Sequence, residues 1–490
     1  MSAETGTPLR ALAVKSAAWY GGTRLWGQLL SWVVTVLLAR MLLPADYGLF
    51  AMAFSVLTAL ELLQEFGLGT AIIQRQDLTR QQINGVFWIV VGSSMVVTAG
   101  ILLAADRISA FYAEPQLPGV LRVLCLTFIL NSIGMVPYNL LSKALDLRRR
   151  SIAEVVGTLV KTLSTLALAY AGFGVWALVW GHLGRAIVLN GALLMFAGWW
   201  PGVRVDRNGM RSVLTFGLRI AGMNLVGNCS PAITTMILGR ILGGTAVGLY
   251  AMSLSLAEAP HRISTAMINQ ISFPVFSRLQ ERPEQLARYF LKISKYLAVV
   301  SLPTQIGLVL IAPDLVPLLL SSRWAAVTVP FQVMCLESAV VIVTLAASPL
   351  LTALGRANFL LGRSVLSVSA MAVATLVGVP FGLVGVVTAR LILMVPLRAT
   401  LVLPSLRALQ VPIRSYLGTL VSAATATGAM AAVVVMVQHF LVPEMGGAGR
   451  IVASVVAGGL TYPAVLLFVD REMAAEVGTI AHDLVSRPAA

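Results

Sequence analysis

The sequence predicts an all-α polytopic membrane protein with about fourteen transmembrane helices, arranged as two six-helix lobes and a C-terminal helix pair. Three observations lead to this fold class: an apolar composition, a series of apolar runs long enough to cross a bilayer, and an internal repeat. Of the 490 residues, 58% are hydrophobic and 11% are charged, and the mean hydropathy is +0.87. Because a soluble domain carries about 25% charged residues, most of this chain is expected to face lipid.

Each predicted span is an apolar run of roughly 20 residues, the length that a helix needs to cross the hydrocarbon core. The runs 246–262 and 362–379 are short, so a total of twelve spans is the alternative. A further stretch, 281–295, is amphipathic and is predicted to lie flat at the inner membrane surface. The predicted spans are 18–38, 47–66, 84–104, 119–141, 153–171, 174–197, 213–238, 246–262, 296–320, 329–352, 362–379, 382–403, 416–440 and 449–469.

The formal net charge of +15 follows the positive-inside rule along the whole chain. If the N-terminus is cytoplasmic, most of the 35 Lys and Arg residues fall in inner loops, among them Arg363 and Arg398 at the ends of their spans. The positive charge is thus expected to face anionic headgroups, and nucleic acid is not an expected partner. Both termini are predicted to be cytoplasmic. The outer loops hold only Arg40, Arg107, Arg240, Arg323 and Arg450.

Residues 37–56 and 237–256 form an internal repeat, although convergence of two similar loop sequences is the alternative explanation. An even number of spans separates the copies, so both have the same orientation, as in parallel-repeat secondary transporters. The repeat predicts an N-lobe of residues 1–203, a C-lobe of residues 204–405, and an appended helix pair with a cytoplasmic tail in residues 406–490. The identical pairs are Leu38/Leu238, Arg40/Arg240, Leu42/Leu242, Gly48/Gly248, Leu49/Leu249, Ala51/Ala251, Met52/Met252 and Ser55/Ser255.

Several short motifs resemble those of one transporter family. They are Ala39–Gly48 (ARMLLPADYG), Phe66–Gln74 (FGLGTAIIQ), Pro137–Leu141 (PYNLL), Gly172–Leu178 (GFGVWAL) and Phe273–Gln280 (FPVFSRLQ). In this order they resemble Wzx-type polysaccharide flippases, in the polysaccharide transporter family of the multidrug/oligosaccharidyl-lipid/polysaccharide superfamily, and specifically its colanic-acid-like exopolysaccharide subgroup.

The resemblance covers roughly residues 10–410 and implies a fold of fourteen helices in two lobes. It also implies a bacterial inner-membrane protein that moves undecaprenyl-diphosphate-linked oligosaccharide between leaflets, for exopolysaccharide or lipopolysaccharide synthesis. A polysaccharide polymerase and chain-length proteins are the protein partners that it implies. The rival classes are a polytopic polysaccharide polymerase or ligase, which is expected to carry a large outer loop, and a drug exporter of the same superfamily, which is expected to have an acidic cavity.

Ionisable residues inside spans are the candidate functional residues, because each costs at least about 2.5–3.5 kcal/mol at the bilayer centre unless it faces water or a partner. Basic residues outnumber acidic ones in the spans, which suits an anionic diphosphate, since guanidinium groups bind phosphate in bidentate fashion. Internal ion pairing is the alternative for each residue. The predicted substrate-binding residues are Arg24, Lys161, Arg185, Arg219 and Arg390, with Asn224 and Asn228 as polar contacts.

Three further residues, Glu258, Glu337 and His182, are candidate proton carriers, because Asp, Glu and His chains relay protons in pumps and transporters. Transport measured with and without a pH gradient tests this role, and indifference to the gradient ends it. The sequence has no GxxxxGK[ST], HExxH, CxxC or GxSxG motif. We therefore predict no catalytic residue, no metal and no cofactor, and transport rather than enzyme activity.

Overall fold

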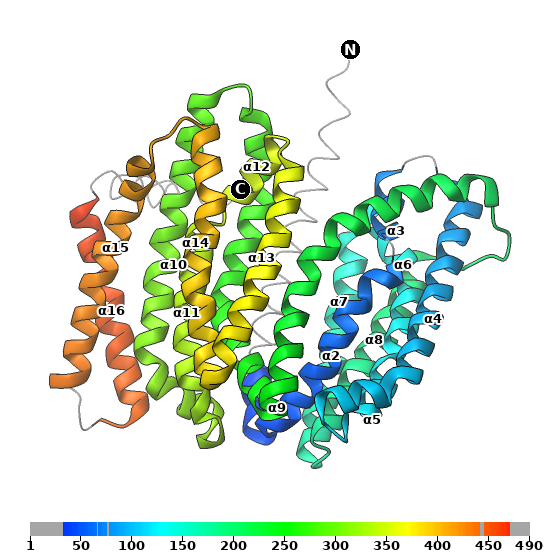
Figure 1. The fold of residues 1–490 in the computed structure, drawn as a ribbon, viewed down its shortest axis with the longest axis horizontal. Helices are drawn as coiled ribbons and strands as arrows, with labels where there is room; N and C mark the ends of the chain where they lie inside the picture. The colour runs from blue at the N-terminus through cyan, green and yellow to red at the C-terminus, as the bar shows by residue number, and fades with distance from the viewer. Residues whose placement is uncertain (1–32, 66, 76–77, 442–444, 471–490) are drawn as a thin grey trace. The chain divides into compact units, whose positions relative to one another are not determined.

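The computed structural model describes residues 33–65, 67–75, 78–441 and 445–470. Within these ranges, the side chains of residues 62–65, 207–213, 216–230, 261–271, 357 and 441 are not described. The described residues are almost entirely helical and contain no strand (Figure 1). In these ranges ten helical segments are long and apolar enough to cross a membrane. The predicted all-α polytopic fold is thus confirmed.

The chain divides into two compact units, residues 1–248 and 249–490. Residues 33–41 of the first unit are helical and include the end of the first predicted span, 18–38. The repeat-based boundary after residue 203 stays a prediction. The remaining helices of the first unit are α2 (Pro44–Glu65), α3 (Leu68–Gln74), α4 (Arg80–Tyr112), α5 (Leu117–Leu124), α6 (Leu126–Lys143), α7 (Leu147–Tyr170), α8 (Val175–Ala197) and the first part of α9 (Arg207–Leu279).

In the second unit the predicted spans fall on helical segments, including the short run 362–379, although the span 329–352 is divided between α11 and α12. Helix α9 breaks at Gly243, whose φ of 79° and ψ of 178° are not helical, and this break separates the predicted spans 213–238 and 246–262. The other elements are α10 (Pro283–Leu320), η1 (Ser322–Val327), α11 (Thr328–Val343), α12 (Ala347–Ala353), α13 (Ala357–Gly378), η2 (Val379–Phe381), α14 (Gly382–Ala408), α15 (Ile413–Met436), η3 (Val437–Leu441) and α16 (Gly447–Val469).

The amphipathic stretch 281–295 is not a separate surface helix, so this prediction is wrong. It is the first part of α10, which continues without a break from Pro283 to Leu320. Its apolar face does exist as expected, but it packs against protein instead of lying on the membrane: Leu286 and Phe290 are each 1% exposed. Burial in a protein core satisfies the same apolar face that a membrane surface would.

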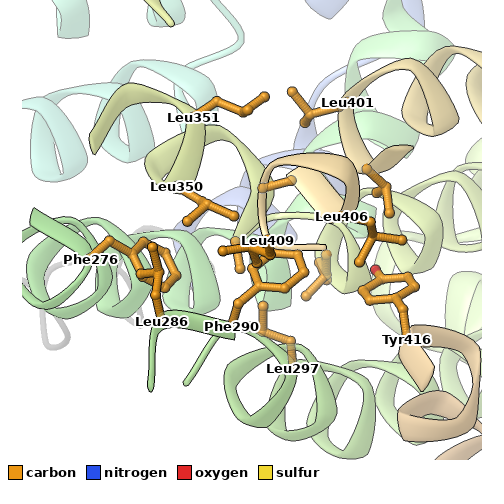
Figure 2. Close-up of a cluster of buried hydrophobic side chains, with 14 residues drawn as sticks. Phe276, Leu286, Phe290, Leu297, Leu350, Leu351, Leu401, Leu406, Leu409 and Tyr416 are labelled. Atoms are coloured by element: carbon orange, nitrogen blue, oxygen red, sulfur yellow. The ribbon is translucent and has the colours of Figure 1, made fainter. Parts of the chain in front are cut away.

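A cluster of buried hydrophobic side chains covers this face (Figure 2). Phe276 at the end of α9, Leu350 in α12 and Leu406 in α14 pack around the start of α10. The ring of Phe290 stacks on Tyr416 with centroids 6.0 Å apart, and the Tyr416 hydroxyl donates to the carbonyl oxygen of Val343 at 3.0 Å. The cluster thereby holds the end of α9, the start of α10, α12, the end of α14 and the start of α15 together.

In the first unit, Asp46 ties the start of α2 to the start of α8. One carboxylate oxygen accepts a hydrogen bond from the Val175 N–H at 3.1 Å, and the other accepts from the Leu43 N–H at 3.0 Å. Gly174 precedes α8 with a φ of 53° and a ψ of −132°, a conformation essentially restricted to glycine. Two of the motifs that carry the family resemblance therefore meet here, and together they set the position of α8.

The two copies of the internal repeat also meet within the first unit, through matched glycines. A methyl group on Gly48 would overlap the carbonyl oxygen of Gly244, and one on Gly248 would overlap the carbonyl oxygen of Pro44. The Cβ added to Gly48 would also lie 3.0 Å from the backbone nitrogen of Gly248, and the Cβ added to Gly248 would lie 3.0 Å from that of Gly48. The contact is therefore the same when viewed from either copy, and it has no room for a side chain.

Candidate functional site

Helices α7 and α8 pack along each other and carry three of the predicted residues, Lys161, His182 and Arg185, which we call the first cluster (Figure 1). Small residues permit this close packing. A Cβ on Gly157 of α7 would lie 3.5 Å from Cγ of Arg185, and one on Gly181 of α8 would overlap the Thr165 hydroxyl. Lys161 lies near the middle of α7 and Arg185 near the middle of α8, so both cations are at mid-span depth.

The two cations of the first cluster repel each other. Lys161 and Arg185 are both half-buried and are close enough to interact electrostatically. Glu154 attracts Arg185 but forms its ion pair with Arg150, at 3.1 Å from Nε to Oε1. Of the carboxylates whose side chains are described, none forms an ion pair with either cation. The first cluster is thus a partly dehydrated pair of positive charges.

His182 contacts aromatic side chains and also has the two cations as neighbours. Its ring makes edge contacts with Phe50 and Phe54 of α2, with centroids 6.1 Å and 5.4 Å away. Its Nδ1 atom is buried and has no hydrogen-bond partner among the described side chains and backbone. Lys161 and Arg185 are its charged neighbours. The imidazole is therefore placed beside the cations, while its role as a proton carrier stays a prediction.

In the second unit, Glu258, Glu337 and Arg390 come together as the second cluster. Arg390 Nη2 donates to Glu337 Oε1 at 3.2 Å, and the two side chains are 12% and 11% exposed. Glu258 in α9 attracts the same guanidinium, whose carbon lies 5.8 Å from the centre of the Tyr250 ring. A predicted substrate contact and two predicted proton carriers thus form one ionic group. For Arg390, the structure contains the internal ion pair that the sequence left open.

Sequence reasoning missed two arginines near the second cluster. Arg363 and Arg398 were assigned to inner loops, but they lie within α13 and α14 and are half-buried. Both fall inside the predicted spans 362–379 and 382–403 but near an edge, where a basic residue is expected to reach the inner membrane surface. The signal that identifies Arg398 is its spacing of two helical turns after Arg390, which puts both residues on one side of α14.

Four predicted site residues cannot be placed. Arg24 lies outside the described residues. Arg219, Asn224 and Asn228 lie on α9, but their side chains are outside the described part of the chain. Their roles stay predictions.

Comparison with known proteins gives one family match and several relatives. The family described as "Polysaccharide biosynthesis protein" matches residues 37–329. The "Lipopolysaccharide biosynthesis protein WzxC" of Escherichia coli (strain K12) is 23% identical over 316 residues, which are 62% of each protein. The "Succinoglycan biosynthesis transport protein ExoT" of Rhizobium meliloti (strain 1021) is 22% identical over 60% of each. The chain thus spans less than two thirds of the length of these relatives.

Two solved structures share the fold. One is described as "Lipid II flippase MurJ, inward closed conformation"; it has a TM-score of 0.76 at 11% identity and covers 93% of this chain and 100% of its own. The other is described as an inward-facing multidrug resistance MATE family transporter of the MOP superfamily. Its TM-score is 0.62 at 15% identity, with 78% and 94% of the two chains covered. The family match and the named relatives confirm the resemblance expected from the sequence motifs, and the two solved structures confirm the fold.

Proposed function

Because the chain belongs to the polysaccharide biosynthesis protein family, whose match covers residues 37–329, we propose that it moves undecaprenyl-diphosphate-linked oligosaccharide across the bacterial cytoplasmic membrane. The substrate passes from the cytoplasmic to the outer leaflet and supplies exopolysaccharide or lipopolysaccharide synthesis. Relatives named for polysaccharide biosynthesis and transport support this proposal, as does a fold shared with a lipid II flippase. The activity is transport without chemical change, with both termini in the cytoplasm.

The first cluster is the observation that carries this proposal. Lys161 and Arg185 are like charges at mid-span depth that have no ionic partner among the described carboxylates. A cation in a membrane span is expensive unless it serves a substrate or ion pathway. A lipid diphosphate supplies two negative charges and several acceptor oxygens, so one headgroup can satisfy both side chains. A drug exporter is expected to have an acidic cavity, whereas the charges of the first cluster are positive.

The mechanism follows from the parallel repeat. Two matched halves that rock around a fixed site expose it to one side of the membrane and then to the other. The diphosphate binds between Lys161 and Arg185 when the site is open to the cytoplasm, and is released when the site opens outward. The Phe50 and Phe54 rings beside His182 provide an apolar wall next to the cations, which strengthens the electrostatic attraction by excluding water.

Substitution of the two cations tests the proposal. Arg185→Ala and Lys161→Ala should each reduce export about ten- to hundredfold at normal protein levels, because a hydrogen bond to a charged group contributes about 1.5–3 kcal/mol. Arg185→Lys should be milder, since it keeps the charge but not the bidentate geometry. The measurement is flipping of fluorescent lipid-linked oligosaccharide in proteoliposomes that contain the full chain.

The matched control is Arg148→Ala, which removes an exposed arginine from the start of the same helix as Lys161 and should leave transport unchanged. Normal flipping by both Ala variants of the first cluster would remove these residues from the substrate site. Loss of flipping by the control as well would show that positive charge anywhere on α7 matters, and not this pair.

A further inference from the structure

A second pair of neighbouring arginines lies in α13 and α14 of the second unit. These two helices are joined by the short η2 element and pack along each other. Arg363 Nη2 lies 3.5 Å from the carbonyl oxygen of Leu397, to which it donates, so its guanidinium reaches the residue beside Arg398. The two guanidinium groups are close enough to repel each other.

These arginines are incompletely satisfied. The Nε atoms of Arg363 and Arg398 are buried and have no hydrogen-bond partner among the described atoms. The carboxylate that attracts Arg398 is Glu337 of α11, but Glu337 is already hydrogen-bonded to Arg390. Of the ion pairs between described side chains, none includes Arg363 or Arg398. Two half-buried cations with unpaired Nε–H groups therefore lie near each other, and no described carboxylate forms an ion pair with either of them.

A pair of neighbouring cations on consecutive helices also occurs in the first unit, although there it lies near the middle of the helices. Helices α7 and α8 are the fifth and sixth spans of the first half of the repeat, and α13 and α14 hold the corresponding positions in the second half. The first pair carries Lys161 with Arg185, and the second carries Arg363 with Arg398. Repulsion of this kind lowers stability unless an anion occupies the space between the charges. The presence of such a pair of cations in both halves points to a bound anion.

We propose that Arg363 and Arg398 form an oxyanion-binding site in the second unit, distinct from the first cluster, that takes a phosphate or carboxylate group of the transported lipid-linked sugar. Guanidinium forks match both groups in bidentate geometry and stay charged when partly dehydrated. The identity of the ligand rests on the proposed function, whereas the binding of an oxyanion does not.

The test is the thermal unfolding of the purified full chain in neutral detergent, with inorganic pyrophosphate as the probe. A background with both Lys161→Ala and Arg185→Ala removes the two cations of the first cluster, so that this cluster does not contribute to the response. In this background pyrophosphate should still raise the melting temperature, and adding Arg398→Gln or Arg363→Gln should abolish the increase. Arg407→Gln, an exposed arginine on the same helix α14, is the matched control and should keep the response.

The melting temperature of the ligand-free protein is a second readout, because a binding role and a structural role of these arginines change it in opposite directions. Removing one of two repelling cations should raise the melting temperature without ligand, whereas a purely structural arginine would lower it on removal. Arg398→Lys keeps the charge and should retain part of the pyrophosphate response. A lower melting temperature for Arg398→Gln, together with an unchanged pyrophosphate response, would overturn the proposal.

Two further probes separate the possible sources of the oxyanion. Glucuronate represents a sugar carboxylate, and phosphatidylglycerol represents a membrane lipid headgroup. Stabilisation by pyrophosphate or glucuronate that depends on Arg398 supports a substrate site. Stabilisation by phosphatidylglycerol alone would assign the pair to a membrane lipid and remove it from the substrate path. Because these assays need no transport, failed flipping by the intact chain would reject the proposed function without rejecting this site.

Discussion

The ion pair between Arg390 and Glu337 gives the sharpest stability prediction. Arg390→Gln leaves the nearly buried Glu337 without its cation, and breaking a buried pair in this way costs about 3–5 kcal/mol. Glu337→Gln should cost less, about 1–3 kcal/mol, because Glu258 and the Tyr250 ring still stabilise the guanidinium. The double Gln variant should recover most of the loss, because it leaves no unpaired charge at this ion pair.

The assay is the thermal unfolding of the four proteins in detergent, analysed as a double-mutant cycle. Arg407→Gln is the control and should stay within about 0.5 kcal/mol of wild type, because the side chain is exposed. Additive effects of the single substitutions would refute the reasoning, since an intact pair requires coupling. Flipping by the double variant then separates two roles: normal transport makes Arg390 structural, whereas lost transport in a stable protein makes it a substrate contact.

Two further predictions concern the contacts that position the first unit. Asp46→Ala should destabilise the protein by about 2 kcal/mol, because Val175 at the start of α8 loses its capping acceptor; a thermal midpoint equal to wild type would contradict this. Gly48→Ala should cost about 1–3 kcal/mol or more, because the methyl group overlaps the Gly244 carbonyl. Gly100→Ala is its control, since a Cβ there has open space, and it should be neutral or stabilising; equal effects at both glycines would refute the close contact.

Most of the fold could be predicted from the sequence, because a chain in lipid has to satisfy its backbone hydrogen bonds internally, and an apolar run of sufficient length can do so as a helix. The edges were harder to predict. Helix α4 continues to Tyr112, beyond the predicted edge at 104, and α10 begins at Pro283, well before the predicted edge at 296. Hydropathy locates the hydrocarbon core, but a helix continues past it wherever protein contacts bury its apolar face.

The candidate site could be predicted in part. The mid-span depths of Lys161 and Arg185 identified them as unusual, and consecutive helices necessarily lie close enough to bring them together. The pairing of Arg390 with Glu337 could not be read from the sequence, because it depends on how α11 packs against α14. Arg363 and Arg398 were missed because their positions near span edges suggested exposure, whereas tertiary packing partly buries them.

The matched glycine contact has a consequence for the origin of the chain. Residue 48 contacts residue 244, and residue 248 contacts residue 44. Each copy of the repeat therefore contributes the same surface to the contact. That is the geometry of an isologous interface, which two identical subunits form about a two-fold axis. If the two copies derive from one duplicated half, a protein of half this length would have formed the same interface as a homodimer.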